Sequence, residues 1–247
     1  MNAVLRKRVP MPLRIAVASV RRHLRDRQSG ATDAMAQRRL NEAESPVFST
    51  LVSVRQPIMM TAYYEGKVTN IRLGASLLNG VVVEPGEIFS FWNLIGRPLA
   101  SAGFAMGRAI REDVLQGDLG GGLCQVSGLA YELGLRAGFE VLERHPHSRD
   151  LYAEEERFTL LGLDATVVWP WKDLRLRNGH STPVCMQFAV GDGWIEGRVL
   201  AQAGLQAFEL DVERTEFADS RKVHVSRRPC NGECQWVSSD TYIVDIH

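Results

Sequence analysis

The feature that most constrains the fold of this chain is a run of three glycines, Gly120, Gly121 and Gly122, that leads into a segment with helical periodicity. The glycines permit a tight turn with positive φ angles, and the apolar residues that follow are spaced like one buried helical stripe. Gly138 is a typical C-terminal stop. The sequence therefore predicts a turn and then a helix over residues 124–137, whose buried stripe consists of Val126, Leu129, Ala130, Leu133 and Ala137.

The predicted helix has a cysteine, Cys124, in its first turn. A thiol at this position meets unpaired backbone N–H groups and the positive end of the helix dipole, and both favour the thiolate. The preceding glycines also let a substrate carbonyl approach the backbone amides, as an oxyanion hole requires. We therefore consider Cys124 a candidate nucleophile and Gly120, Gly121 and Gly122 candidate substrate-binding residues.

A nucleophilic cysteine needs a base, and the nearest downstream candidates are His145 and His147 in the segment RHPHS. A helix that returns through a short turn into a neighbouring strand brings such a histidine back to the start of the helix. Asp164 follows on the next predicted strand and is the candidate that orients the imidazole. We favour His147, because Pro146 stiffens the approach to it, and we keep His145 as the alternative.

Each of these residues also has a purely structural interpretation. A cysteine on an apolar helix is often a small core residue, RHPHS fits a polar loop with capping roles, and Asp164 fits an ordinary turn. Arg144 is a candidate ligand for a substrate carboxylate, with a salt bridge to Glu143 or in the neighbourhood of Glu140 as the alternative. The three glycines before the cysteine and the two histidines after the helix favour the chemical interpretation.

The rest of the chain reads mostly as short strands separated by turns. From residue 60 onward we expect extended runs punctuated by glycine, and the glycines of residues 97–122 predict loops around a site. Strand patterns follow in residues 139–143, 160–178 and several later segments. The prediction is an α+β fold, with one main helix that starts at the cysteine motif and packs on a largely antiparallel sheet.

The 247 residues are 45% hydrophobic and 23% charged, which is enough apolar material for one large or two small domains. Lys+Arg and Asp+Glu both number 29, so there is no net positive field of the kind that draws proteins to nucleic acid. We divide the chain into a basic N-terminal extension, partly helical or flexible (residues 1–45), a core domain (46–200), and a strand-rich C-terminal segment of the same domain (201–247).

The first 40 residues are rich in arginine and nearly free of acid. They contain no apolar stretch long enough for a secretory signal, and no later window reaches the roughly 18 apolar residues of a membrane span. The expectation is a cytoplasmic protein without a transmembrane span. We interpret the basic segment as an extension, with contact to an anionic membrane surface through residues 1–40 as the alternative.

The chain has four cysteines, Cys124, Cys185, Cys230 and Cys234. Because the sequence has no recognisable secretory signal, these cysteines do not indicate a disulfide framework. Cys230 and Cys234 lie in a turn-rich segment, which we interpret as carrying free thiols or a redox-labile pair. A zinc site there would need two more ligands, and His224 and His247 are the nearest histidines. We expect no metal and no cofactor.

Three segments together resemble the VanW-like family, named after an accessory protein of glycopeptide-antibiotic resistance clusters. The matching segments are PGEIFSFWNLIGRP (85–98), GGGLCQVSGLAYELGLRAGFEVLERHPHS (120–148) and DATVVWPWKDLRLRN (164–178). The block GGG-x-CQ-x-S joined to ERH-x-HS is specific to this family.

The resemblance implies a chemistry, because some members resemble L,D-transpeptidases, which cross-link peptidoglycan stems through a cysteine acyl-enzyme. By that resemblance Cys124 would attack a tetrapeptide carbonyl, His147 or His145 would move protons, and an acceptor amine would resolve the thioester. Gln125 and Ser127 match motif positions and would donate hydrogen bonds to the intermediate. We therefore expect a cysteine-dependent acyl transferase or amide-cleaving enzyme acting on a peptide-like, cell-wall-derived substrate. The alternative is a non-catalytic peptide- or glycan-binding accessory protein linked to cell-wall metabolism or antibiotic resistance.

Overall fold

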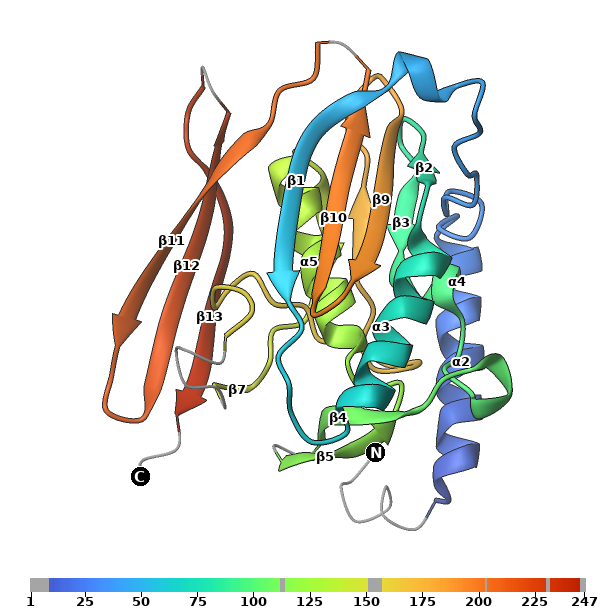
Figure 1. The fold of residues 1–247 in the computed structure, drawn as a ribbon, viewed down its shortest axis with the longest axis vertical. Coiled ribbons are helices and arrows are strands. Elements are labelled where there is room, and N and C mark those ends of the chain that lie inside the picture. The colour runs from blue at the N-terminus through green and yellow to red at the C-terminus, as the bar shows by residue number, and fades with distance from the viewer. Residues whose placement is uncertain (1–8, 112–113, 151–156, 203, 230–231, 245–247) are drawn as a thin grey trace.

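Helix α5 (Leu123–Arg136) lies between two largely antiparallel sheets in the computed structural model, which describes residues 9–111, 114–150, 157–202, 204–229 and 232–244 (Figure 1). This arrangement confirms the predicted α+β fold with a helix that starts at the cysteine motif. The other helices are α2 (Met11–Gln28), α3 (Tyr64–Leu78), the short α4 (Phe91–Ile95) and the 3₁₀ turns Ser45–Val47 and Ala100–Ala102.

The sheet on one side of α5 has the strand order β1-β10-β9-β2, with every neighbouring pair antiparallel. Strands β9 and β10 form a hairpin at the predicted Gly-Asp-Gly turn, where Gly193 has a φ of 73°. The strands are β1 (Ser49–Pro57), β2 (Val81–Val83), β9 (Val184–Gly191) and β10 (Trp194–Ala201).

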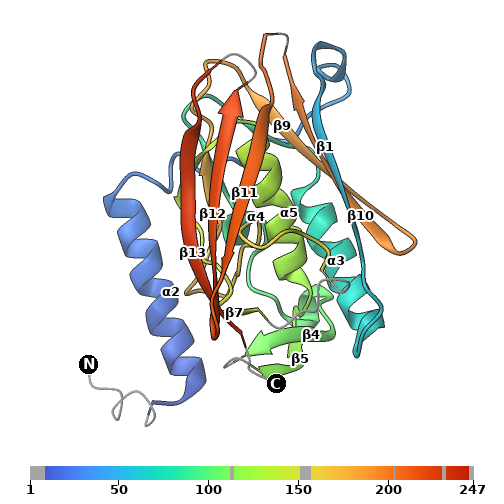
Figure 2. The same ribbon diagram turned by 90° about the vertical axis from the view of Figure 1, so that its left-hand side faces the viewer.

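The sheet on the other side of α5 consists of the C-terminal strands β11 (Phe208–Glu216), β12 (Ser220–Pro229) and β13 (Gln235–Val244), with β7 (Arg149–Asp150) parallel to β13 (Figures 1 and 2). A third sheet has the order β3-β8-β6 and is antiparallel throughout. Its strands are β3 (Ile88–Ser90), β6 (Glu140–Glu143) and β8 (Arg175–Arg177).

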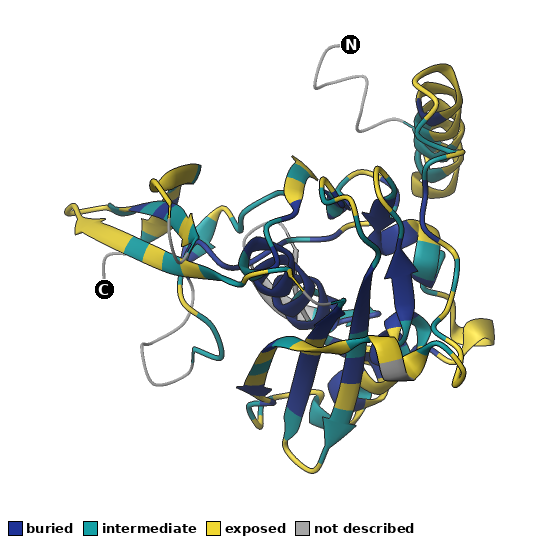
Figure 3. Cartoon of the chain, turned by 90° about the horizontal axis from the view of Figure 1, so that it is seen from above, coloured by how far each residue is buried: buried dark blue, intermediate teal, exposed yellow. Residues whose placement is uncertain are grey.

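Helix α5 is almost completely buried, and its predicted apolar stripe is fully excluded from solvent (Figure 3). Glycines let its neighbours come close. A Cβ on Gly197 of β10 would lie 2.4 Å from Leu133, and a Cβ on Gly134 of α5 would lie 2.5 Å from Leu176 of β8. The predicted stop at Gly138 has a φ of 79°. The core therefore holds α5 tightly, which fixes the position of its first turn.

The basic N-terminal segment contains helix α2, which docks on the body of the protein through ion pairs. Arg22 makes a bidentate pair with Glu143 at 2.8 and 3.0 Å, and Asp26 makes one with Arg175 at 2.7 Å for both bonds. Residues after the helix continue into the core, where Ala36 is fully buried. Among the described residues, no helix is both long and apolar enough to cross a membrane.

Two segments differ from the sequence prediction. Residues after 60 were expected to be extended, but α3 is a helix whose buried residues include Val68, Ile71, Ala75 and Leu78. This helical spacing is interrupted by glycines, which made the segment look extended. Residues 97–122 were expected to be loops, but they contain the hairpin of β4 (Met106–Arg111) and β5 (Val114–Leu119).

The third difference concerns residues 160–174, which were expected to form a strand. They are irregular up to β8, and Asp164 therefore lies in a loop. Their backbone groups find partners outside a sheet: the Ser127 hydroxyl donates to the Ala165 carbonyl at 2.6 Å, and the Thr166 amide donates to the His145 carbonyl at 2.7 Å. These bonds hold the loop against the start of α5.

The glycine loop before α5 is packed backbone against backbone on strand β4. A Cβ on Gly121 would lie 2.2 Å from the carbonyl oxygen of Gly107, and a Cβ on Gly107 would lie 2.3 Å from that of Gly121. Gly122 has a φ of 102°, and a Cβ there would lie 2.9 Å from Cγ of Lys67 in α3. Close approach, in addition to backbone conformation, therefore requires glycine in this loop.

This packing predicts that Gly121→Ala destabilises the protein by about 2 to 4 kcal/mol, because two backbones must separate. Gly179→Ala is the matched control, since a Cβ at Gly179 meets nothing within 4 Å, and it should change the free energy of unfolding by less than about 0.5 kcal/mol. Urea unfolding of both variants measures the difference. Equal effects of the two substitutions would contradict the packing argument.

Candidate active site

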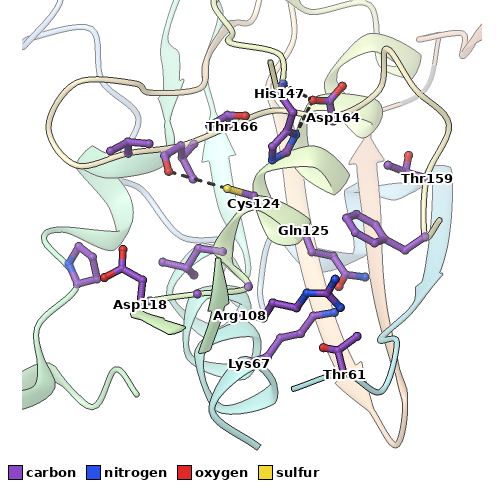
Figure 4. A pocket seen from close by; sticks show the side chains of 18 of the residues that line it. Thr61, Lys67, Arg108, Asp118, Cys124, Gln125, His147, Thr159, Asp164 and Thr166 are labelled. Atoms are coloured by element: carbon purple, nitrogen blue, oxygen red, sulfur yellow. Dashed lines mark hydrogen bonds and ion pairs between the residues drawn. The ribbon is translucent and has the colours of Figure 1, made fainter. Parts of the chain in front are cut away.

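A cavity of about 390 Å³ opens at the N-terminal end of α5 (Figure 4). The glycine loop forms part of its wall, and side chains from α3, β4, α5 and the loop before β8 complete it. Polar residues that line the cavity include Lys67, Arg108, Asp118, Cys124, Gln125, His147, Asp164 and Thr166.

Cys124 is half-buried in the first turn of α5, two residues after the left-handed N-cap residue Gly122. Its sulfur lies 3.9 Å from the carbonyl oxygen of Val167, which can accept a hydrogen bond from the S–H group of the neutral thiol. The residue lines the cavity. The predicted position of a thiol at a helix N-terminus is therefore the observed one.

His147 lies beside Cys124 and is held by Asp164 (Figure 4). Its ring Nδ1 is 2.7 Å from Asp164 Oδ2, and its backbone amide donates to the same oxygen at 2.7 Å. Because Nδ1 is bonded to the carboxylate, Nε2 is the ring nitrogen left to interact with the Cys124 sulfur, whose charge and hydrogen bonding help to raise the pKa of His147. The structure thus brings together the three predicted residues Cys124, His147 and Asp164.

The carboxylate of Asp164 accepts hydrogen bonds at both oxygens. Oδ2 takes the two from His147, while Oδ1 accepts the hydroxyl of Tyr242 at 2.6 Å and a guanidinium N–H of Arg144 at 3.0 Å. Arg144 is in turn paired with Asp240 of β13. The C-terminal sheet therefore contributes directly to the position of the imidazole.

The charges of this cluster favour a thiolate beside an imidazolium. Burial raises the pKa of the Cys124 thiol, but the hydrogen bond and charge of His147 outweigh it, so the pKa lies below its ordinary value. Burial lowers the pKa of His147, but Asp164 and Cys124 outweigh it and raise the pKa to about 10. Burial also raises the pKa of Asp164, yet its hydrogen bonds and neighbouring cations hold it well below the usual range.

The other predicted residues near the histidine have structural partners. His145 does not line the cavity; its Nε2 lies 3.1 Å from Glu143, in the ion-pair cluster under α2. Arg144 was a candidate for a substrate carboxylate, but its guanidinium is committed to Asp164, Asp240 and backbone carbonyls and its side chain is 5% exposed.

The two predicted donors after the cysteine differ from each other. Gln125 lines the cavity, with its amide nitrogen bonded to the Pro57 carbonyl at 2.8 Å and its Oε1 without a partner among the described residues. Ser127 is fully buried outside the cavity wall, and its hydroxyl donates to the Ala165 carbonyl. Gly120, Gly121 and Gly122 line the cavity.

Sequence reasoning missed several residues that act on this site. Tyr242 and Asp240 lie more than 70 residues after Asp164 in an ordinary strand pattern, so nothing local marks them. Lys67 is a charged residue on the buried face of α3, and a lysine within an apolar helical stripe is a signal that could have drawn attention to it.

Cys185 and Cys234 do not line the cavity. Cys185 is fully buried, and burial raises its pKa to about 12. Cys234 carries an exposed free thiol. Cys230 and His247 lie outside the described residues, so the predicted pairing or zinc site near them stays a prediction. Within the described ranges, no group of three or more His, Cys, Asp or Glu side chains is arranged to hold a metal ion.

Comparison with protein families places the site in a known sequence family. The model of the family described as "VanW like protein" matches residues 66–200, more than half of the chain. The chain belongs to the VanW-like family. Cys124, His147 and Asp164 all lie inside the matched segment, whereas Tyr242 and Asp240 lie beyond its end.

Two curated relatives resemble this VanW-like chain. It is 32% identical over 145 residues to "Vancomycin B-type resistance protein VanW" of Enterococcus faecalis (strain ATCC 700802 / V583), an alignment that covers 59% of this chain and 53% of the relative. It is 32% identical over 118 residues to "Uncharacterized protein YoaR" of Bacillus subtilis (strain 168), covering 48% and 37%. The chain thus spans about half or less of the length of these relatives. No solved structure matches it.

The pair of Cys124 thiolate and His147 imidazolium predicts how the stability of the protein depends on pH. In the unfolded chain, the pKa values of histidine and cysteine are about 6.5 and 8.5, so His147 and Cys124 have both lost their protons above pH 8.5. In the native protein, the His147 imidazole keeps its proton up to about pH 10. A raised native pKa stabilises the fold below the unfolded pKa, and this stability is lost as the pH rises through the native pKa. The stability advantage of wild type over Cys124→Ala/His147→Gln should therefore fall by up to about 1.4 kcal/mol per pH unit between pH 8.5 and 10.

Urea unfolding of both proteins across this range measures the effect, and charges common to both cancel in the difference. A difference that stays constant with pH would mean that the native imidazole is neutral.

Proposed function

We propose that this VanW-like protein is a cysteine-dependent acyl transferase or amide-cleaving enzyme that acts on a peptide-like, cell-wall-derived substrate. The observation that carries the proposal is the cluster of Cys124, His147 and Asp164 in the wall of an open cavity. Nucleophile, base and orienting carboxylate in this order are the parts that thiol acyl transfer needs.

In the first half of the reaction, the Cys124 thiolate attacks the carbonyl carbon of a substrate amide. A carbon–sulfur bond forms, and the carbonyl oxygen becomes negatively charged. His147 donates its Nε2 proton to the amine nitrogen as the carbon–nitrogen bond breaks, which leaves a thioester and a neutral imidazole. Asp164 keeps the proton on Nδ1, so that Nε2 is the nitrogen that exchanges protons.

In the second half, an acceptor amine or water attacks the thioester carbonyl. His147 removes a proton from the attacking group, the carbon–sulfur bond breaks, and the thiolate is restored beside the imidazolium. An amine acceptor yields a new amide and water yields a free acid. The same residues therefore serve transfer and cleavage, and the acceptor decides between them.

The backbone at the helix start supplies donors for the oxyanion. The amides of Gly120 and Gly121 already donate to the Ala105 and Asp118 carbonyls. Within the described chain, no acceptor is found for the amides of Gly122 and Cys124, which stand at the positive end of α5. We assign these two N–H groups to the tetrahedral intermediate.

A peptide-like substrate is supported by unpaired polar atoms in the cavity wall. Gln125 Oε1, Thr159 Oγ1 and Thr166 Oγ1 are buried and have no hydrogen-bond partner among the described residues. Buried polar atoms without partners are rare, and a ligand with amide groups would satisfy them. The cell-wall origin is supported by the resistance to vancomycin that the name of the Enterococcus faecalis relative records.

The proposal predicts that Cys124→Ser abolishes turnover of peptidoglycan-derived tetrapeptides and that His147→Gln lowers it by about 10² to 10⁴-fold. His145→Gln is the matched control and should retain turnover, because His145 lies outside the cavity wall. Mass spectrometry of the wild-type protein should detect a thioester adduct on the peptide that contains Cys124.

Two results would count against catalysis. One is a cellular effect that survives Cys124→Ser, which would favour the binding or accessory role. The other is an alkylation rate of Cys124 by iodoacetamide that rises only near pH 8.5, as for an unperturbed thiol, because the native pair should already hold a thiolate below that pH.

A further inference from the structure

Helix α2 has a docked side whose partners all lie within the protein. Ile15, Arg22 and Asp26 repeat on this side at helical spacing. Ile15 lines the cavity, and Arg22 makes its bidentate pair with Glu143. Asp26 makes the second bidentate pair, with Arg175. The docked side therefore needs no further partner.

The side of α2 that faces away from the protein is apolar. Its side chains follow the spacing i, i+4, i+7, i+11, so they form one continuous stripe about 16 Å long. Figure 3 shows α2 at the periphery of the molecule with most of its surface exposed. Single exposed apolar side chains are common, but a continuous apolar stripe marks an interaction surface. The stripe consists of Leu13 (55% exposed), Val17 (42%), Val20 (57%) and Leu24 (52%).

Arginines border this stripe on both sides. Arg14, Arg21 and Arg25 follow the spacing i, i+7, i+11 along one border, and Arg27 lies on the other. Within the described part of the chain, none of these four side chains is paired with a carboxylate. The only acid of the helix, Asp26, belongs to the docked side. The stripe and its borders are thus apolar and cationic, without a negative charge.

The helix dipole accounts for only part of this charge pattern. Arg25 and Arg27 lie in the last turn, where cations stabilise the C-terminal end of a helix. Arg14 lies near the opposite end, where a cation is unfavourable, and the first turn contains no acid. The arginines near the stripe therefore indicate an anionic partner in addition to their effect on the helix.

A second copy of the chain is a poor partner for this surface. Two α2 helices packed stripe against stripe would bring their arginine borders together, and neither helix offers a free acid to separate them. A partner protein would favour aromatic anchors, whereas the stripe is made of leucine and valine. An anionic bilayer supplies both requirements, because it offers phosphates to the arginines and an acyl region to the aliphatic side chains.

We propose that α2 binds the protein to anionic membrane surfaces through this stripe. The helix lies in the plane of the interface, its leucines and valines enter the boundary between headgroups and acyl chains, and the bordering guanidinium groups bind lipid phosphates. Because the stripe faces away from the docked side, membrane binding leaves the ion pairs of Arg22 and Asp26 in place. The proposal is independent of any chemistry at Cys124.

Membrane binding through α2 has a consequence for the candidate site. Ile15, on the docked side of the same helix, is part of the cavity wall. An α-helix with its side chains is about 10 Å across, so this part of the wall would lie about one helix diameter from the lipid. The stripe would therefore hold the cavity beside the membrane.

Sedimentation of the full chain with lipid vesicles tests the apolar contribution. Wild type should sediment with vesicles of phosphatidylcholine mixed with about one-third phosphatidylglycerol, and much less with phosphatidylcholine alone. Val20→Gln/Leu24→Gln removes apolar surface without adding charge, and it should lower the affinity for the mixed vesicles at least about tenfold. Phe217→Gln/Trp236→Gln is the matched control, because both side chains are exposed and apolar but belong to the C-terminal sheet region. It should bind like wild type.

A second pair of variants tests the charge contribution. Arg21→Gln/Arg25→Gln should lower the affinity for the mixed vesicles about tenfold or more, and about 0.5 M salt should weaken the binding of wild type. Lys222→Gln/Arg228→Gln removes the same charge from exposed positions on β12 and should have little effect. Urea unfolding midpoints equal to that of wild type confirm that the variants are folded, since all the replaced side chains are exposed.

Three outcomes would overturn the proposal. Wild type that stays in solution with the mixed vesicles has no membrane-binding surface. Undiminished sedimentation of Val20→Gln/Leu24→Gln would place the binding surface elsewhere. A lipid-free dimer in sedimentation velocity that these glutamines dissociate would assign the stripe to a second copy of the chain. Cys124→Ser should bind vesicles like wild type, so a failure of the proposed catalysis leaves this test unaffected.

Discussion

The Asp164 carboxylate is the interaction on which the candidate site depends. It lies in an irregular loop, where no sheet or helix fixes it, and it is positioned by four hydrogen bonds, two from His147 and one each from Arg144 and Tyr242. Because both oxygens are occupied, the carboxylate cannot rotate without losing partners. The orientation of the imidazole, and with it the charge of the sulfur, follows from this fixed anion.

The glycine loop is the second constraint, and it connects the fold to the site. The two backbones at Gly107 and Gly121 touch because neither residue has a side chain. This contact lets β4 and α3 approach the first turn of α5, so Lys67 and Arg108 enter the same cavity as Cys124. A loop with side chains would separate these elements, and the cations would lie away from the thiol.

Much of this arrangement could be predicted from the sequence because its signals are local. The helix over 124–137, its glycine start and stop, the turn at residues 191–193 and the α+β class all follow from periodicity and turn residues. The cluster of Cys124, His147 and Asp164 was predicted from residue chemistry and order. By contrast, α3 was missed because Gly66 and Gly74 interrupt its stripe, although they are there to allow close contacts with Met106 and Leu123.

What could not be predicted depends on contacts between distant parts of the chain. The loop at residues 160–174 has strand-like composition, but the hydroxyl of Ser127 and the carbonyl of His145 bind its backbone and prevent a sheet. Arg144 looked available for a ligand because its partners Asp240 and Tyr242 are almost a hundred residues away.

The position of Tyr242 has a consequence for sequence variation in this protein and for the choice of fragment boundaries. The thiol and the imidazole belong to the family segment, but one of the donors that fixes their carboxylate comes from the last strand. A fragment trimmed to the boundaries of the family segment would keep every reacting atom. It would still lose the Tyr242 hydrogen bond that helps to fix Asp164, and with it part of the support for the lowered pKa of Cys124. Drift in the C-terminal hairpins is accordingly a route by which evolution could adjust or silence reactivity without altering the family motif.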